Sequence, residues 1–325
     1  MRYFVTGGAG GFGLTFAERA RAAGDEVVAL VRRAEDPRAD ALKALGVELA
    51  VGEVGDPEFM AKAAAGAEVV VHAAGTSDPF APEDALAWLH IAGTENVMRA
   101  AEHAGCRRVV HLSCTDVTLH RGPRMNWDEQ RSLPREPTGA LAKSKQLAEE
   151  IALSFHGPKL EVCVLRPGWL WGGAERANRD RFVARAARYG VGLIGGGRAM
   201  IATTHLETLV DAVLEAAEES AAAGRMYYIT DDVLESQASF FGAYAEALGL
   251  PRPRRGAPRD VAYAAALVSP NLARGYAPAE VLAWGWDTFF VTSRARNELG
   301  WTPRTDRSAL FEALAKTRQI AAQNR

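Results

Sequence analysis

The sequence predicts an α/β protein built on a doubly wound parallel sheet, with a smaller, mixed region toward the C-terminus. Short apolar runs typical of buried strands recur along the first half, and segments with helical spacing separate them. The first apolar run, residues 3–5, ends in a cluster of glycines that opens directly into the first helical segment. Strands that alternate with helices in this way form βαβ units and lie parallel in one sheet.

The glycine cluster at residues 7–13 is the first indication of function. Gly7 lets the chain turn sharply after the strand, Gly10 leaves room for a diphosphate beside the backbone, and Gly13 allows close helix packing. Free N–H groups at the start of the helix over residues 14–23 can hold phosphates. A glycine-rich turn without a ligand is the alternative, but the strand–turn–helix–strand context favours a dinucleotide-binding Rossmann domain.

The composition limits the classes of function. The 325 residues include 48% hydrophobic residues, enough for one large domain or two smaller ones, and the net charge of −2 gives no reason to expect nucleic acid or membrane binding. No apolar run reaches transmembrane length, and the early first strand leaves no room for a signal peptide, so we expect a cytoplasmic protein. Richness in Ala, Arg and Gly indicates a bacterial source. Cys106, Cys114 and Cys163 lack metal-site spacing, so we expect buried free thiols and no metal.

The spacing Gly7-x-x-Gly10-x-x-Gly13 after Thr6 resembles the N-terminal TGxxGxxG motif of the extended short-chain dehydrogenase/reductase family. Further family motifs match in order at residues 67–75 (VxHxAA), 144–149 (SKxxAE), 160–168 (RPG) and 291–303 (SxAxxxLGWxP). The resemblance runs from residue 3 to about residue 315. The basic loop at 251–258 and the late apolar helices are most similar to the 3β-hydroxysteroid dehydrogenase and dihydroflavonol reductase branch. That branch implies a small, apolar ketone or alcohol as substrate.

The resemblance implies a nicotinamide dinucleotide cofactor. It assigns to this cofactor Gly7, Gly10, Gly11, Phe12, Gly13, Arg32, Glu53, Val54, Ala73, Ala74, Gly75, Lys145 and Pro167. In NAD-binding units an acidic residue at the end of the second strand takes the ribose hydroxyls, whereas an Arg suits a 2′-phosphate. Here Val31 is followed by Arg32 and Arg33, so we predict NADP in preference to NAD. A solvated Arg pair at a helix start is the alternative.

The catalytic Tyr-x-x-x-Lys pair of the family is incomplete in this sequence. Lys145 takes the Lys position, but Leu141, which has no titratable proton, stands where the Tyr is expected. The resemblance assigns to Thr115, at the end of a strand over residues 107–115, the role of holding the substrate oxygen. Asp116 is the candidate for moving the proton, since a carboxylate beside an apolar pocket has a raised pKa. The alternatives are a plain strand residue for Thr115 and a turn cap for Asp116.

Two histidines and two tryptophans complete the set of candidate residues. His90 replaces a family Asn that supports the active-site geometry, and His72 is interpreted as a packed histidine at a strand end. Trp169 and Trp171 follow the RPG motif and predict an apolar pocket wall, with core packing as the alternative.

The chain is divided into a dinucleotide-binding domain at 1–168 and a substrate-binding region at 169–325, partly intercalated with the sheet. We predict residues 225–232 as a strand of the smaller region and residues 261–268 as a buried helix. The family resemblance and the apolar Leu147 and Ile151 permit a homodimer through the helix that carries Lys145.

Three functions remain open from the sequence. The first is an atypical NADP(H)-dependent oxidoreductase acting on a small ketone or alcohol, in which Asp116 or water moves the proton. The second is a dehydratase or epimerase with a retained cofactor, although Val117 stands where that branch has its base. The third is a catalytically silent dinucleotide sensor. Each implies a small-molecule ligand, and none requires a nucleic acid or membrane partner.

Overall fold

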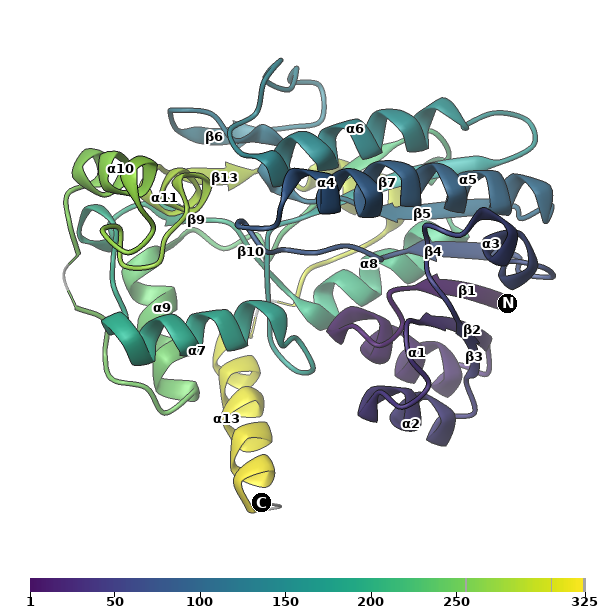
Figure 1. The fold of residues 1–325 in the computed structure, drawn as a ribbon, viewed down its shortest axis with the longest axis horizontal. Helices are drawn as coiled ribbons and strands as arrows, with labels where there is room; N and C mark the ends of the chain where they lie inside the picture. Colours follow the sequence, from purple (N-terminus) through teal and green to yellow (C-terminus); the bar gives the residue numbers. More distant parts are fainter. Residues whose placement is uncertain (255, 305, 324–325) are drawn as a thin grey trace.

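The computed structural model describes residues 1–254, 256–304 and 306–323, with side chains as far as residue 316. Its central layer is a seven-stranded sheet in the order β11-β7-β5-β4-β1-β2-β3, and every strand pairing in it is parallel (Figure 1). The strands are β1 (Arg2–Thr6), β2 (Glu26–Val31), β3 (Glu48–Val51), β4 (Val69–His72), β5 (Arg108–Leu112), β7 (Glu161–Pro167) and β11 (Met226–Ile229). This topology confirms the predicted doubly wound Rossmann sheet.

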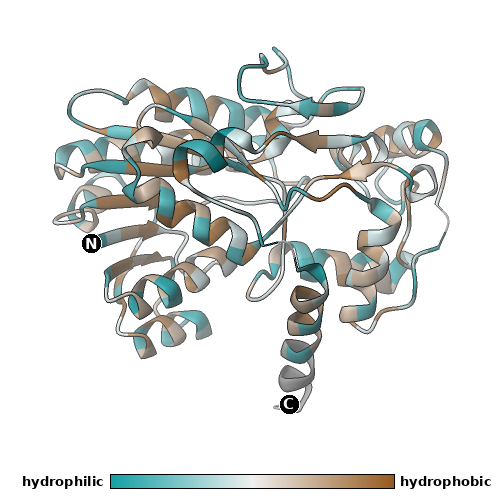
Figure 2. Cartoon of the chain, turned by 180° about the vertical axis from the view of Figure 1, so that it is seen from behind, coloured by the Kyte–Doolittle hydropathy of each residue, from teal (hydrophilic) through white to brown (hydrophobic). Residues whose placement is uncertain are grey.

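Helices cover both faces of the sheet because its strands are apolar on both sides, as Figure 2 shows by colour. On one face Tyr3 and Val5 pack with α1 (Gly11–Ala22) and α8 (Leu206–Glu218), beside α2 (Pro37–Ala44) and α12 (Ser293–Leu299). On the other face Phe4 packs with α3 (Pro57–Ala63), α5 (Gly93–His103) and α6 (Ala140–Ser154). Successive strand residues point to opposite faces, so one strand contributes to both cores.

The strand predicted within residues 225–232 has a different place from the one expected. β11 pairs in parallel with β7 through Tyr227↔Leu165 and is the edge strand of the central sheet, so its assignment to the smaller region was wrong. The physical reason is burial on both sides: Tyr227 packs in the core beside α8, and Tyr228 stacks on Phe290 at 4.4 Å between ring centroids.

The smaller region surrounds its own apolar cluster beyond the carboxyl ends of the strands (Figure 1). Its helices are α7 (Ala177–Tyr189), α9 (Gln237–Ala247), α10 (Arg259–Val268), α11 (Pro278–Gly285) and α13 (Arg307–Gln323). Three strand pairs link it to the rest: β8 (Trp169–Trp171) with β10 (Thr203–His205), β9 (Met200–Ile201) with β12 (Glu235–Ser236), and β6 (Arg124–Trp127) with β13 (Thr288–Phe290).

Helix α10 corrects the expectation of a buried helix over residues 261–268. Only its small residues, such as Ala262 and Ala266, are buried, whereas Leu267 and Val268 are 63% and 76% exposed. Within the described ranges, no helix is both long enough and apolar enough to cross a membrane. On α6, Leu147 is exposed, and the predicted homodimer through this helix stays a prediction.

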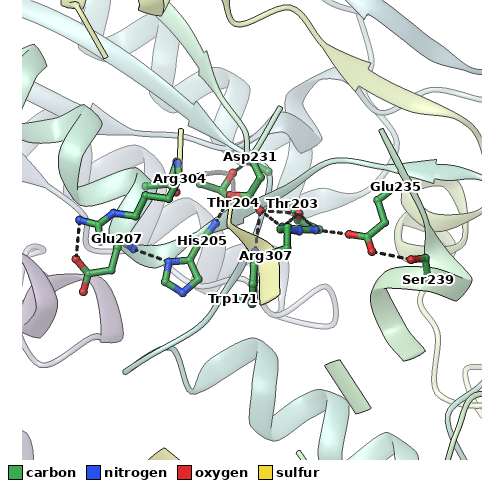
Figure 3. Close-up of polar contacts among 12 residues, drawn as sticks. Trp171, Thr203, Thr204, His205, Glu207, Asp231, Glu235, Ser239, Arg304 and Arg307 are labelled. Atoms are coloured by element: carbon green, nitrogen blue, oxygen red, sulfur yellow. Dashed lines mark hydrogen bonds and ion pairs between the residues drawn. The ribbon is translucent and has the colours of Figure 1, made fainter. Parts of the chain in front are cut away.

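A buried carboxylate ties the two regions together (Figure 3). Asp231 follows β11 and is 1% exposed. It accepts hydrogen bonds from Trp171 Nε1 (2.8 Å), Thr203 Oγ1 (2.8 Å), the His205 backbone N–H (2.7 Å) and Arg307 Nη1 (2.6 Å). The network therefore joins β8, β10 and α13 to the edge of the sheet, and every part of it depends on one negative charge.

Replacing that charge tests the network. Asp231→Asn leaves the half-buried Arg307 with Glu235 as its remaining anion and puts a neutral amide among the donors that Asp231 binds. Leaving a buried donor unsatisfied costs about 1–3 kcal/mol, so the unfolding free energy should fall by about that amount. Urea denaturation of both proteins measures the loss. Ser239→Ala, which removes only an exposed hydrogen bond to Glu235, is the control and should change stability by less than about 0.5 kcal/mol. Equal stability of Asp231→Asn and wild type would show that the network is not structural.

Candidate functional site

A cavity of about 340 Å³ lies where β1, β4, β5 and β7 end. The chain builds β2 and β3 on one side of β1 and then crosses to β4 on the other, so the cavity sits at the switch point where ligands bind such sheets. The predicted site residues that line it are Gly7, Gly10, Gly11, Phe12, Ala73, Gly75, Thr115, Asp116, Lys145 and Pro167. Gly13, Arg32, Glu53, Val54 and Ala74 belong to its surroundings and not to its lining.

The glycine turn forms one end of the cavity. Gly7 has a positive φ of 72°, and a Cβ there would stand 2.9 Å from the carbonyl oxygen of Ala73. Helix α1 begins at Gly11, and the preceding Gly10 supplies no side-chain cap, so the first N–H groups are left for an anion. A Cβ at Gly13 would meet the Gly7 oxygen at 2.6 Å, which agrees with its predicted packing role. These residues fit a dinucleotide diphosphate.

The end of β4 is fixed by hydrogen bonds to Thr6. Its Oγ1 accepts the backbone N–H groups of Ala73 (3.1 Å) and Ala74 (3.0 Å) and lies 2.8 Å from His72 Nδ1. His72 Nε2 contacts Thr94 Oγ1 at 3.0 Å, and burial lowers the pKa of His72 to about 3. His72 is thus a packed, neutral strand-end histidine, as interpreted from the sequence.

The residues predicted to contact the adenosine end of the cofactor lie outside the cavity lining, and their role stays a prediction. Arg32 and Glu53 are exposed and do not line the cavity. Val54 is buried against Gly93, where an added Cβ would lie 2.9 Å from the Val54 side chain. A further arginine, Arg38, lies against the glycine turn. Its Nη1 donates to the Ala9 carbonyl (2.7 Å).

Arg38 also bridges to a distant loop. Its Nη2 donates to the Ala174 carbonyl at 3.1 Å. Burial is the main cause that lowers the pKa of Arg38, and repulsion from Arg176 and Arg179 lowers it further. Arg38 therefore lies beside the turn among two further arginines and the carboxylates of Asp36 and Glu175. Sequence reasoning missed this residue because its partners lie 29 and 136 positions away, and no local spacing marks such contacts.

Helix α6 carries Lys145 into the cavity. Lys145 is buried, its Nζ donates to the Leu112 carbonyl at 3.0 Å, and burial lowers its pKa. Leu141, one turn earlier, lines the same cavity, so the position of the family Tyr is an apolar wall here. A buried ion pair holds the helix in place, since Arg166 on β7 binds Glu149 with bonds of 2.9 and 2.6 Å.

His90 supports the same helix from the other side. It lies in a π-helical turn, Ala87–Ala92, and its Nε2 accepts the Thr76 N–H at 3.2 Å. Nδ1 therefore carries the proton and donates to Ser144 Oγ at 2.9 Å, and Ser144 in turn donates to the Leu141 carbonyl. Burial lowers the pKa of His90 to about 2, with a further contribution from Lys145, so the imidazole stays neutral.

The segment after β5 supplies the remaining polar groups. β5 ends at Leu112, so Thr115 begins a 3₁₀ turn, Thr115–Thr118, and the expected strand end at residue 115 was wrong. Asp116 forms no side-chain hydrogen bond within the described ranges, and only its carbonyl closes the turn, to the Leu119 N–H at 2.8 Å. Burial raises the pKa of Asp116, while Arg124 opposes this shift. Its carboxyl group is thus available to a ligand and does not cap the turn.

The far end of the cavity is built by residues that the sequence did not single out. Arg124 comes from β6, Trp284 from α11 and Thr288 from β13, and no motif marks them because the fold alone brings them together. Of the two predicted tryptophans, Trp169 lines the cavity and Trp171 lies in the core with no exposed surface. The apolar wall here consists of Leu119, Leu141, Ala142, Trp169, Ala279, Ala283 and Trp284.

Comparison with known proteins gives a consistent result. The model of the 3-beta hydroxysteroid dehydrogenase/isomerase family matches residues 4–256. A 4-hydroxy-2-methyl-3-oxo-4-farnesyl-3,4-dihydroquinoline-1-oxide ketoreductase from Stigmatella aurantiaca is 30% identical over 97% of this chain and 96% of its own length. A 2-alkyl-3-oxoalkanoate reductase from Stenotrophomonas maltophilia is 26% identical over 81% of this chain and 80% of its own. A dTDP-glucose 4,6-dehydratase from Streptomyces venezuelae, solved with NAD, shares the fold with a TM-score of 0.77 at 22% identity, covering 99% of this chain and 98% of that one.

The neutral state of His90 predicts a pH effect on stability. Between the folded pKa and the unfolded pKa of about 6.5, His90 binds a proton in the unfolded chain but not in the folded protein. Lowering the pH through this range therefore favours the unfolded chain. Through His90 alone, lowering the pH from about 7 to about 5.5 should remove about 1.3 kcal/mol of unfolding free energy. Urea denaturation at both pH values should therefore show a smaller loss for His90→Asn than for wild type. His103→Asn, at an exposed position on α5, should keep the wild-type loss, and an unchanged loss in His90→Asn would contradict the assignment.

Proposed function

Because this chain belongs to the 3-beta hydroxysteroid dehydrogenase/isomerase family of extended short-chain dehydrogenases/reductases, we propose that it is an NADP(H)-dependent ketoreductase that works without the family's tyrosine. Membership confirms the resemblance drawn from the sequence motifs. One observation carries the proposal: Lys145, Thr115 and the unpartnered carboxyl of Asp116 line the same cavity as the glycine turn. The names of the two reductase relatives support a ketone as the substrate.

The cofactor would occupy the end of the cavity beside the glycine turn. The N–H groups at the start of α1 would bind its diphosphate, and Lys145 would bind the ribose next to the nicotinamide. When bound, the reduced cofactor supplies a hydride to the substrate carbon. The positive charge of Arg38 and Arg176, together with the exposed Arg32 after β2, supports NADP in preference to NAD.

Asp116 would replace the missing tyrosine as the acid. Burial favours its protonated form, which donates a proton to the substrate oxygen, and the O–H of Thr115 orients that oxygen. The product is an alcohol, and the carboxylate left on Asp116 regains a proton from water that reaches the cavity. Lys145 remains bonded to the Leu112 carbonyl and has no tyrosine to activate, so its role is binding.

A dehydratase or epimerase reaction has less support. That chemistry needs a second titratable group beside Asp116. The next residue is Val117, which has no titratable group, is buried and does not line the cavity. A dinucleotide sensor without turnover remains the other alternative, and the experiments below separate it from a reductase.

Binding of the four nicotinamide dinucleotides is the first test. Calorimetric titration should give a dissociation constant at least about tenfold lower for NADPH than for NADH, because a guanidinium–phosphate bond contributes about 1.5–3 kcal/mol. Arg38→Gln should weaken the binding of NADPH more than the binding of NADH. Arg99→Gln, on the exposed face of α5, should change the affinity for neither cofactor. If no dinucleotide binds, the oxidoreductase proposal is wrong.

The acid can be tested with any ketone found in a carbonyl screen of the wild-type protein. Asp116→Asn keeps the shape but cannot donate the proton, so kcat should fall about 100-fold or more while NADPH affinity stays unchanged. Lys145→Ala should instead weaken both cofactor binding and turnover. Asp128→Asn, a carboxylate outside the cavity lining, is the matched control and should behave as wild type.

A sensor predicts that none of these proteins turns over any ketone, although all bind the cofactor. Leu141→Tyr restores the family residue one turn before Lys145 and should raise the activity of Asp116→Asn if the proton is what that variant lacks. Undiminished turnover in Asp116→Asn would assign proton delivery to water.

A further inference from the structure

Arg124 is a buried cation at the end of the cavity away from the glycine turn. It begins β6, and its backbone N–H donates to the Asp287 carbonyl at 2.8 Å, which fixes its position. The side chain is 2% exposed and lines the cavity. One nitrogen, Nη2, donates to Thr288 Oγ1 at 2.7 Å and makes longer contacts with the Leu282 and Ala283 carbonyls at 3.5 and 3.4 Å.

The rest of the guanidinium has no comparable partner. Nε is buried without a hydrogen bond, and no bond of Nη1 to a residue within the described ranges is found. A buried guanidinium whose N–H groups are unpaired is costly, and burial lowers the pKa of Arg124 to about 10. An arginine that served only to link α11 with β13 would need Nη2 alone. The two guanidinium nitrogens without a partner in the described part of the chain, Nε and Nη1, are therefore the feature that needs an explanation.

The acidic groups of the cavity do not neutralise this charge. Asp116 is close enough that each group shifts the other's pKa, yet the two form no ion pair. Glu280 also lines the cavity, but its carboxylate is occupied: Oε1 binds Arg185 at 3.1 Å and Oε2 accepts the Ala277 N–H at 3.0 Å. Glu175, the other lining carboxylate, accepts the backbone N–H groups of Asn178 and Arg179. Among the described residues, Arg124 is therefore a cation without an ion pair, close to a carboxyl group that burial tends to protonate.

We propose that Arg124 binds a carboxylate of the substrate, so that the ketone reduced here is a keto acid with its carboxylate close to the reacting carbonyl, as in a 3-oxo acid. The proposal rests on the proposed function only in placing the carbonyl beside Asp116. Carboxylate oxygens match the planar fork of a guanidinium and can accept from two of its nitrogens at once. Nη1 has no partner among the residues that the structure describes and is the donor available for this contact, whereas Nε is shielded from the cavity.

The wall around Arg124 indicates the rest of the ligand. Leu119, Ala142, Ala283 and Trp284 line this part of the cavity, and alkyl or aryl groups are buried favourably against such side chains. An anionic head with an apolar tail fits both features. The corresponding alcohol is a 3-hydroxy acid, which is chemically more stable than the 3-oxo acid and is therefore the better probe.

Equilibrium binding of 3-hydroxydecanoate and its methyl ester tests the inference without any turnover. Calorimetry on the wild-type protein should show the acid binding about tenfold or more tightly than the ester, which has the same chain and no charge. Arg124→Gln should raise the dissociation constant of the acid by about 10- to 100-fold and change that of the ester by less than about twofold. Arg121→Gln is the matched control, because it removes an exposed arginine three positions away that stacks on Tyr263 outside the cavity.

The outcomes separate this inference from the proposed function. Equal affinity of wild type for acid and ester, or equal weakening of both by Arg124→Gln, would show that Arg124 is structural. If Arg124→Gln fails to fold, Arg124→Lys keeps the charge but loses the planar fork, and it should weaken the acid selectively. Because binding is measured without hydride transfer, a protein that binds the acid through Arg124 but reduces no keto acid would contradict only the ketoreductase proposal.

Discussion

The buried ion pair between Glu149 and Arg166 is the interaction on which the rest of the site depends. Both side chains are almost fully buried, and the guanidinium also donates to Tyr228 on the edge strand. The pair joins α6 to β7, and these two elements carry the Lys145 and Pro167 sides of the cavity. An ion pair at this depth needs its full set of hydrogen bonds, because either charge alone would be severely destabilising. The position of Lys145 relative to the strand ends is thus set by a contact about one helical turn away from the chemistry.

The same support persists although the tyrosine is absent. His90, Ser144 and the Leu141 carbonyl form a chain of hydrogen bonds that would hold the first turn of α6 whichever side chain occupied position 141. What the substitution removes is only the titratable proton. A cavity-lining carboxyl group without a side-chain partner in the described residues, that of Asp116, projects from the turn after β5, which packs against α6. The scaffold can therefore keep the lysine that we propose binds the ribose while the proposed source of the proton lies on another element.

Local patterns in the sequence predicted the parts of the site that local chemistry determines. The glycine turn, the strands of the sheet and Lys145 each belong to a short motif whose spacing has a physical reason, and all line or build the cavity. Arg38 and Arg124 could not be found in this way, because their carbonyl and hydroxyl partners lie 29 to 164 positions away. The edge strand β11 was misplaced for the same reason, since apolar alternation specifies a strand but not its neighbour. Sequence patterns thus identified the elements, and the pairing of distant segments decided which charges meet.

The distribution of charge connects the two ends of the cavity. Arginines beside the glycine turn would attract the phosphates of a dinucleotide, while Arg124 presents a separate cation to the substrate region. Arg124 also opposes the burial that raises the pKa of Asp116. A carboxylate bound to Arg124 would cancel that opposing charge and so favour the protonated form of Asp116. In that arrangement the bound substrate would itself keep Asp116 protonated. An anion at Arg124 would hold the proton on Asp116 until the carbonyl oxygen accepts that proton. A neutral ketone would leave Arg124 uncompensated and Asp116 more readily ionised, so selection for the keto acid would act on proton transfer as well as on binding.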